Sequence, residues 1–258
     1  MTHDTLLLIG RASTATTAVL DRQAERLDRR GVVDDVRVAT YDAEPVRELK
    51  AEFRALAADR VFAVPAVVAH SYETTDAIPA ALSYVPGEVC YCEPLGGSPN
   101  ITDALVERAA DHYEPAEDVS LVLVGLGSSS KPFPEQAVEH HAARIRESAA
   151  FGEVVSSYLM QNPAVECVRY NVTNERAVAV PVFVTPSTAT TERIPAKLEL
   201  DRGGMAYADV LGDHPEVTDA IHATVERRRV LADEGGTHSF EDSLVESSQP
   251  VATDGEGR

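Results

Sequence analysis

The sequence contains no tryptophan, three cysteines and only three lysines in 258 residues. Three cysteines in a chain of this length do not form the dense disulfide framework of small secreted domains. No apolar run approaches the ~20 residues that span a bilayer, and the N-terminus lacks the basic segment of a signal peptide. These absences predict a soluble, cytoplasmic protein.

Basic residues are scarce as a group, because 23 Lys and Arg face 42 Asp and Glu, a net charge of −19. A surface this acidic argues against partners that need a basic face, such as nucleic acid or an anionic membrane. The shortage of lysine and the abundance of small residues are typical of halophilic proteins, whose charge repulsion is screened in molar salt. The alternative is an acidic protein that needs no salt.

The chain repeats itself. LLLIGRAS at 6–13 matches LVLVGLGS at 121–128, and TTDAIPAAL at 74–82 matches TTERIPAKL at 190–198. The offset is 115 residues between Gly10 and Gly125 and 116 between Pro65 and Pro181. Matches at almost one offset predict a tandem duplication.

Each half alternates short apolar runs with helical patterns. Near-continuous apolar strands separated by helices predict an α/β fold in which a parallel sheet is covered on both faces. A ligand then belongs at the carboxyl ends of the strands, where the small-residue loops lie. The predicted domains are residues 1–115 and 116–232, followed by an acidic, disordered tail at 233–258.

Four blocks resemble a known family. They are LLLIGRAS, VFAVPAVVAHSYETTDAIP, YCEPLGGSPNITDAL and LVLVGLGS, and they are similar to the class II chelatases of the sirohydrochlorin cobaltochelatase (CbiX) family, related to the SirB iron chelatases. The resemblance implies two chelatase-like α/β domains that face a central cleft. It also implies insertion of Co²⁺, or of Ni²⁺ or Fe²⁺, into a tetrapyrrole for cobalamin or sirohaem synthesis, with no tightly bound cofactor. Because the duplication supplies both cleft walls, a monomer is expected.

The chain departs from the family at its histidines. Where the family has the histidine of its Gly-His-Gly-Ser motif, this chain has Arg11 and, in the second half, Leu126. Where the family has its second histidine, six residues before the proline of Ile-Pro, this chain has Glu73 and Ala189. A neutral imidazole binds a first-row metal and accepts a proton near pH 7. Leu126 and Ala189 do neither.

The expected site therefore lies in the first half. Glu73 and His70 are the predicted catalytic residues, and with Asp42 they are the predicted metal ligands. Arg11 is expected to bind a substrate carboxylate, and Ser13 and Ser128 are expected to contact the substrate from the small-residue loops. The simpler interpretations are that His70 caps its strand and that Glu73 is a solvated loop acid. The adjacent pair His140-His141 is expected at the surface of a helix.

Two other functions stay open. Loss of the histidines with retention of the surrounding loops fits a binding protein that holds a tetrapyrrole or a metal without inserting one. A regulatory partner of an active chelatase is the third possibility.

Overall fold

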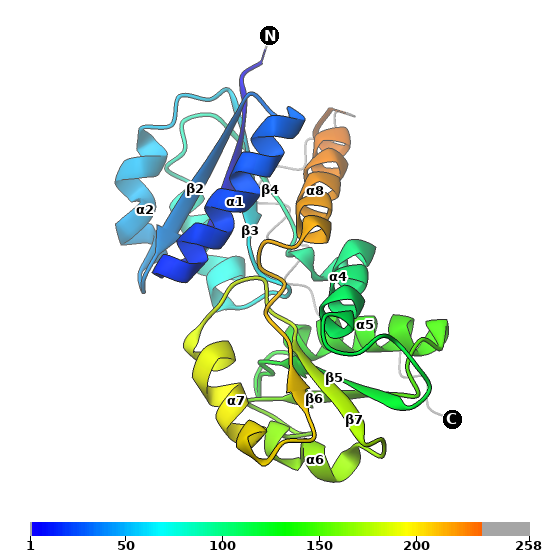
Figure 1. The fold of residues 1–258 in the computed structure, drawn as a ribbon. Coiled ribbons are helices and arrows are strands. Elements are labelled where there is room, and N and C mark those ends of the chain that lie inside the picture. The colour runs from blue at the N-terminus through cyan, green and yellow to red at the C-terminus, as the bar shows by residue number, and fades with distance from the viewer. Residues whose placement is uncertain (1, 234–258) are drawn as a thin grey trace, which may run out of the picture.

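The computed structural model describes residues 2–233, and their strands form two four-stranded parallel sheets (Figure 1). The first sheet has the order β2-β1-β3-β4 and the second the order β6-β5-β7-β8. The strands of the first half are β1 (Asp4–Arg11), β2 (Asp35–Tyr41), β3 (Arg60–Pro65) and β4 (Glu88–Tyr91). Those of the second half are β5 (Val119–Gly125), β6 (Glu153–Tyr158), β7 (Arg176–Pro181) and β8 (Ala206–Tyr207). The predicted α/β fold is confirmed.

Helices connect the strands. The first half contributes α1 (Thr14–Arg30), α2 (Pro45–Arg54), α3 (Ile78–Leu82) and α4 (Pro99–Ala110). The second contributes α5 (Phe133–Ser148), α6 (Val168–Asn171), α7 (Ile194–Lys197) and α8 (Pro215–Asp233). Strand β5 is buried along its whole length, as expected of a parallel strand with helices on both faces.

A glycine in the last two residues of each central strand allows a helix to pack closely. A Cβ on Gly10 would come within 2.8 Å of Leu20 in α1, and one on Gly125 within 2.7 Å of Val138 in α5. The motif glycines thus fix the position of the helix that follows each strand-end loop.

The last helix of each half packs against the other half. Helix α4 contacts β7 and α5, whereas α8 contacts β3, β4 and α1, and the two helices also contact each other. Figure 1 shows α8 beside the upper lobe, which the first half forms, and α4 beside the lower one. Because each of these helices packs against the opposite half, this exchange of helices joins the two sheets.

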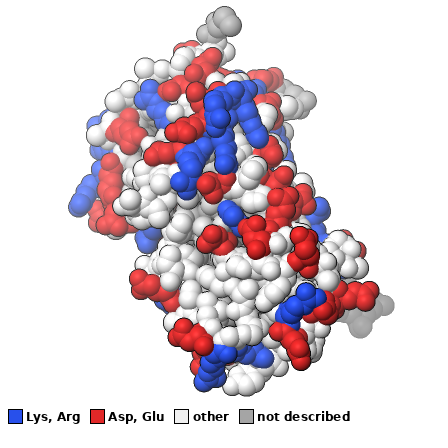
Figure 2. All heavy atoms as spheres, in the orientation of Figure 1, with Lys and Arg blue, Asp and Glu red and all other residues white. Residues whose placement is uncertain are grey.

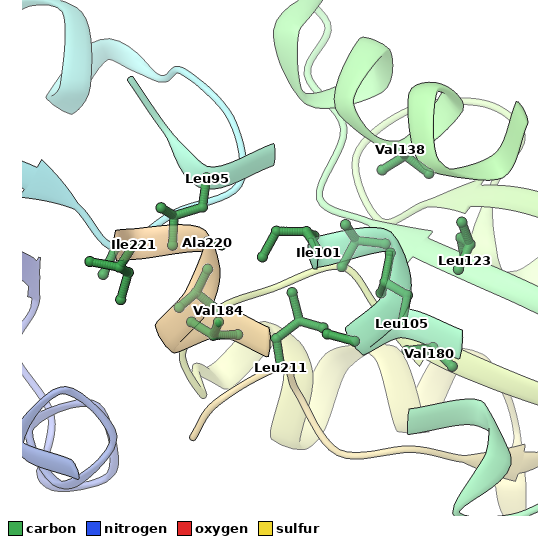
Figure 3. Close-up of a cluster of buried hydrophobic side chains, with 14 of the residues drawn as sticks. Leu95, Ile101, Leu105, Leu123, Val138, Val180, Val184, Leu211, Ala220 and Ile221 are labelled. Carbon is green, nitrogen blue, oxygen red and sulfur yellow. The ribbon is translucent and has the colours of Figure 1, made fainter. Parts of the chain in front are cut away.

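One hydrophobic core runs through both halves as a result. It contains β1 and β3 residues such as Leu8 and Phe62 and also β5 and β7 residues such as Leu123 and Val180. Figure 3 shows Leu105 of α4 and Ile221 of α8 among the side chains of this cluster. Two smaller clusters cover the outer faces, one under α2 and α3 and the other under α6 and α7.

The sequence repeat is also a repeat of hydrogen bonds. Tyr91 donates its hydroxyl to the carbonyl of Thr74 at 2.8 Å, and Tyr207 donates to Thr190 at 2.8 Å. In both halves a short π-helical segment precedes Ile-Pro, at Glu73–Ala77 and Ala189–Arg193. Equivalent positions in the two halves can therefore be compared residue by residue.

The predicted boundary between residues 115 and 116 falls in the connection from α4 to β5. It separates the two sheets, although α4 and α8 each cross to the other side of it. Beyond Asp233, the predicted tail lies outside the described residues. No helix in the described range is both long and apolar enough to cross a membrane.

His141 is not at the surface, so that prediction is wrong. Its side chain is fully buried in α5, and its Nδ1 lies 2.8 Å from the hydroxyl of Thr102 in α4. Burial lowers the pKa of His141 to about 4, and the ring is neutral at pH 7. His140 stays exposed. Helix α4, which comes from the other half, covers the face of α5 that carries His141. The sequence pattern of α5 alone cannot reveal this burial.

Candidate active site

The loops at the carboxyl ends of the two sheets meet each other. The hydroxyl of Thr16, which follows β1, lies 3.4 Å from the carbonyl of Pro186, which follows β7. Lys131, which follows β5, donates its ammonium to the hydroxyl of Thr75, which follows β3, at 3.4 Å. Parallel sheets carry their sites at these strand ends. The candidate site therefore lies where the two halves face each other.

Arg11 and Glu73 come together there. The Arg11 Nη2 lies 3.5 Å from the Glu73 Oε1, with side chains that are 63% and 34% exposed. The hydroxyl of Ser71 donates to the other carboxylate oxygen of Glu73 at 2.8 Å. These two contacts orient the carboxylate and leave about a third of its side chain open to solvent. A partly exposed carboxylate of this kind can bind a metal ion or accept a proton from a bound substrate.

Tyr41 is a part of the site that the sequence did not identify. It pairs with Arg11 in the register of β1 and β2 and is almost fully buried. Burial raises the pKa of Tyr41 to about 12, and the negative charge of Glu73 adds to the rise. The phenol therefore keeps its proton at neutral pH. In the sequence, only its position at the end of a strand, next to Asp42, indicates that Tyr41 belongs to the site.

Asp42 lies at the end of the same strand and is exposed. Its backbone N–H donates to the carboxylate of Glu48 at 2.7 Å. The N–H groups of Ala43 and Glu44 donate to the same carboxylate at 3.0 and 2.7 Å. These three hydrogen bonds lower the pKa of Glu48 to about 2. Glu48 thus fixes the loop that carries Asp42.

His70 faces a different space. Its Nε2 lies 2.7 Å from a carboxylate oxygen of Glu93, and its Nδ1 lies 3.2 Å from the hydroxyl of Thr74. The hydrogen bond from His70 lowers the pKa of Glu93. Both ring nitrogens are thus engaged, and metal ligation by His70 requires one of these bonds to break.

A cavity of about 350 Å³ opens beside this pair. His70 and Glu93 line it from the first half, Phe133 and His140 from α5, and Arg227 from α8. Arg11 and Glu73 are not among its lining residues. The structure therefore divides the predicted site into two places, which the hydrogen bonds of Ser71 and Thr74 connect.

The predicted metal ligands are not arranged as a preformed metal site. Within residues 2–233, no three His, Cys, Asp or Glu side chains are placed to hold one metal ion. Ligation by Glu73, His70 and Asp42 together stays a prediction. Cys90 and Cys92 are buried, and burial raises the pKa of Cys90 to about 11.

The two predicted substrate-binding serines hold their own loops. Ser13 caps α1 by accepting a hydrogen bond from the N–H of Thr16 at 2.9 Å. Ser128 accepts from the N–H of Lys131 at 3.1 Å. Contact of either hydroxyl with a substrate stays a prediction.

Comparison with known proteins agrees with this architecture. The sequence model of the CbiX family matches residues 5–112 and matches again at residues 120–228. The chain belongs to the CbiX family. A probable sirohydrochlorin cobaltochelatase of Halobacterium salinarum is 28% identical to it over 199 residues, which are 67% of this chain and 68% of the relative.

Solved structures show the same CbiX-family fold. The sirohydrochlorin chelatase SirB of Bacillus subtilis subspecies spizizenii, in complex with cobalt, matches with a TM-score of 0.71 and 18% identity, over 92% of this chain and 99% of SirB. A multi-domain protein of Deinococcus radiodurans with structural similarity to chelatases matches with a TM-score of 0.69 and 23% identity. That match covers 87% of this chain and 55% of the Deinococcus protein.

Proposed function

We propose that this CbiX-family chain is a sirohydrochlorin-type chelatase that inserts a divalent metal ion, Co²⁺, into the tetrapyrrole. One observation carries the proposal most directly. Arg11 and Glu73 stand at the two motif positions where the family has histidines, and in the fold they pair with each other at the meeting strand ends. A cation and an acid thus lie at the place where a tetrapyrrole would receive its metal.

Insertion of a divalent ion requires the macrocycle to release two pyrrole N–H protons. Each N–H bond breaks, its electron pair stays on the pyrrole nitrogen, and the four ring nitrogens then bind the metal. The Glu73 carboxylate offers the incoming metal an oxygen ligand and, as the metal passes to the ring, accepts one of the two protons, while solvent water takes the other. Arg11 cannot act as a base, so it binds a carboxylate at the edge of the substrate.

His70 has a positioning role in this proposal. It lies three residues before Glu73 and contacts Thr74, whose hydroxyl accepts the N–H of Ser71 at 2.8 Å. Ser71 in turn donates to Glu73. His70 thus orders the segment from which the Glu73 carboxylate projects.

A non-catalytic tetrapyrrole-binding protein is the second candidate. Neither half has an imidazole at the family's two motif positions, and the nearest histidine, His70, is occupied by Glu93 and Thr74. A cleft that binds the pigment without a strong base would show this arrangement.

Absorbance spectroscopy separates the two candidates. Purified protein in molar KCl is mixed with sirohydrochlorin and Co²⁺, and a sample without protein gives the spontaneous rate. Faster formation of cobalt-sirohydrochlorin supports the chelatase. A bound-pigment spectrum with no acceleration supports the binding protein, and no change in either spectrum or rate contradicts both.

A further inference from the structure

In the second half, the residues equivalent to Arg11, Asp42 and Glu73 are all apolar. Gly10 pairs with Thr40 and Gly125 with Tyr158. Met160, two residues beyond the end of β6, therefore occupies the position of Asp42. Leu126 follows Gly125 as Arg11 follows Gly10, and Ala189 begins its π-helical segment as Glu73 does. A polar triplet in one half thus corresponds to an apolar triplet in the other.

Two members of this triplet are unusually open for apolar side chains. Leu126 is 42% exposed and Met160 is 54% exposed. The N–H of Met160 donates to the carbonyl of Leu126 at 2.9 Å, so the two residues are neighbours at the strand ends. Contiguous exposed apolar side chains mark a binding surface more often than isolated ones do. We call Leu126, Met160 and Ala189 the apolar wall.

Arg193 contacts the apolar wall, and Lys131 reaches from the same half toward the first half. The guanidinium of Arg193 lies 3.4 Å from the sulfur of Met160, and Lys131 lies on the loop that follows Leu126 and contacts Thr75 of the first half. Among the described residues, neither Arg193 nor Lys131 forms an ion pair with a carboxylate. In a chain with 42 acids, a cation against the apolar wall and a second one between the two halves match a ligand that is flat and apolar at its centre and anionic at its edge.

We propose that the apolar wall holds one face of the tetrapyrrole macrocycle, while Arg193 and Lys131 bind its peripheral carboxylates. The inference rests on the proposed function and assigns separate tasks to the two halves. The second half holds the pigment by apolar contact and charge, and Glu73 of the first half acts on the opposite face. The two duplicated halves thus have different tasks: the second half holds the pigment, and the first half carries the reacting carboxylate.

Binding of metal-free sirohydrochlorin tests the proposal without any metal insertion. The double variant Leu126→Asn/Met160→Gln keeps side-chain size and removes the apolar surface. Its dissociation constant, from absorbance titration in molar KCl, is expected to rise on the order of 30-fold because about two half-buried apolar contacts are lost. Arg193→Gln is expected to weaken binding on the order of 5-fold, with a smaller effect at higher salt.

A matched control is the double variant Val230→Asn/Leu231→Asn. It removes two apolar side chains on α8 that are each 53% exposed, and it is expected to bind the pigment as wild type does. Circular dichroism shows whether each variant is folded.

The outcomes distinguish this inference from the proposed function. If wild type binds the pigment and the wall variant binds equally well, the apolar wall is not its site. If wild type does not bind metal-free or metal-containing pigment at all, the proposed function itself fails. If sedimentation shows a wild-type dimer that the wall variant abolishes, the wall holds a second copy of the chain, and the inference is overturned.

Discussion

At the scale of single residues, the site depends on a few contacts that fix Glu73. Arg11 and Ser71 engage its two oxygens, and buried Tyr41 lies close enough for the Glu73 charge to raise the Tyr41 pKa. Carboxylates as a class are weaker proton acceptors than imidazole near pH 7. The structure therefore predicts a slower chelatase than one with histidines at these positions.

Substitution of His70 tests its positioning role. His70→Ala removes the contacts with Glu93 and Thr74 and is expected to lower the insertion rate on the order of 10-fold, since a misplaced catalytic group loses effectiveness quickly. His70→Gln retains a hydrogen-bonding side chain and is expected to recover most of that loss. The insertion rate of both variants is measured at saturating sirohydrochlorin. Equal, severe loss in both variants would instead assign His70 a direct role at the metal.

The sequence identifies Arg11 and Glu73 as site residues, but it does not predict the ion pair between them or its surroundings. The internal repeat and the family motifs locate both residues by position alone, because the loops follow predictable strands. The pairing of His70 with Glu93 and the burial of Tyr41 depend on side-chain directions in loops, which no periodicity encodes. His141 shows the same limit, because the helix that covers it comes from the other half.

At the scale of elements, the exchange of α4 and α8 joins the halves. Sequence patterns predict the alternation of strands and helices in each half, since apolar periodicity is local. They do not predict the exchange, because an apolar helix face does not specify which sheet it covers. Each half therefore depends on the other for part of its core.

Gln23 of α1 tests this dependence. It is fully buried, and its amide donates to the carbonyls of Gly212 and His214, while its carbonyl accepts from Thr218 of α8 at 2.6 Å. Gln23→Leu leaves these buried groups without partners, at a cost of about 2–4 kcal/mol in the free energy of unfolding. Denaturant titration measures the change.

The control is Gln136→Leu, at an exposed position on α5, which is expected to change the unfolding free energy by less than about 0.5 kcal/mol. If Gln23→Leu unfolds at the same denaturant concentration as wild type, the contact between α1 and α8 does not hold the halves together.

At the scale of the whole molecule, net charge is expected to determine how stability depends on salt. Figure 2 shows acidic side chains scattered over both lobes of the visible face and a cluster of Lys and Arg side chains on the upper lobe. A net charge of −19 repels itself strongly at low ionic strength, whereas the Debye length falls to about 3 Å in 1 M salt. Composition alone predicts this behaviour, because it needs no knowledge of the fold.

Dialysis from 3 M to 0.05 M KCl is therefore expected to unfold the protein or to lower its melting temperature by more than about 10 °C. Circular dichroism at a series of salt concentrations measures the change. An unchanged melting temperature across the series would show that the acidic surface does not require salt, and the halophilic interpretation would be wrong.

The central claim is that Glu73 in the first half performs the chemistry of metal insertion. It is tested most directly by the rate at which Glu73→Gln forms cobalt-sirohydrochlorin in molar KCl, relative to wild type and to the exposed control Glu192→Gln in the second half's π-helical segment. We expect Glu73→Gln to lose on the order of 100-fold of the protein-dependent rate while still binding the pigment, and Glu192→Gln to match wild type. A Glu73→Gln variant as fast as wild type would contradict the account.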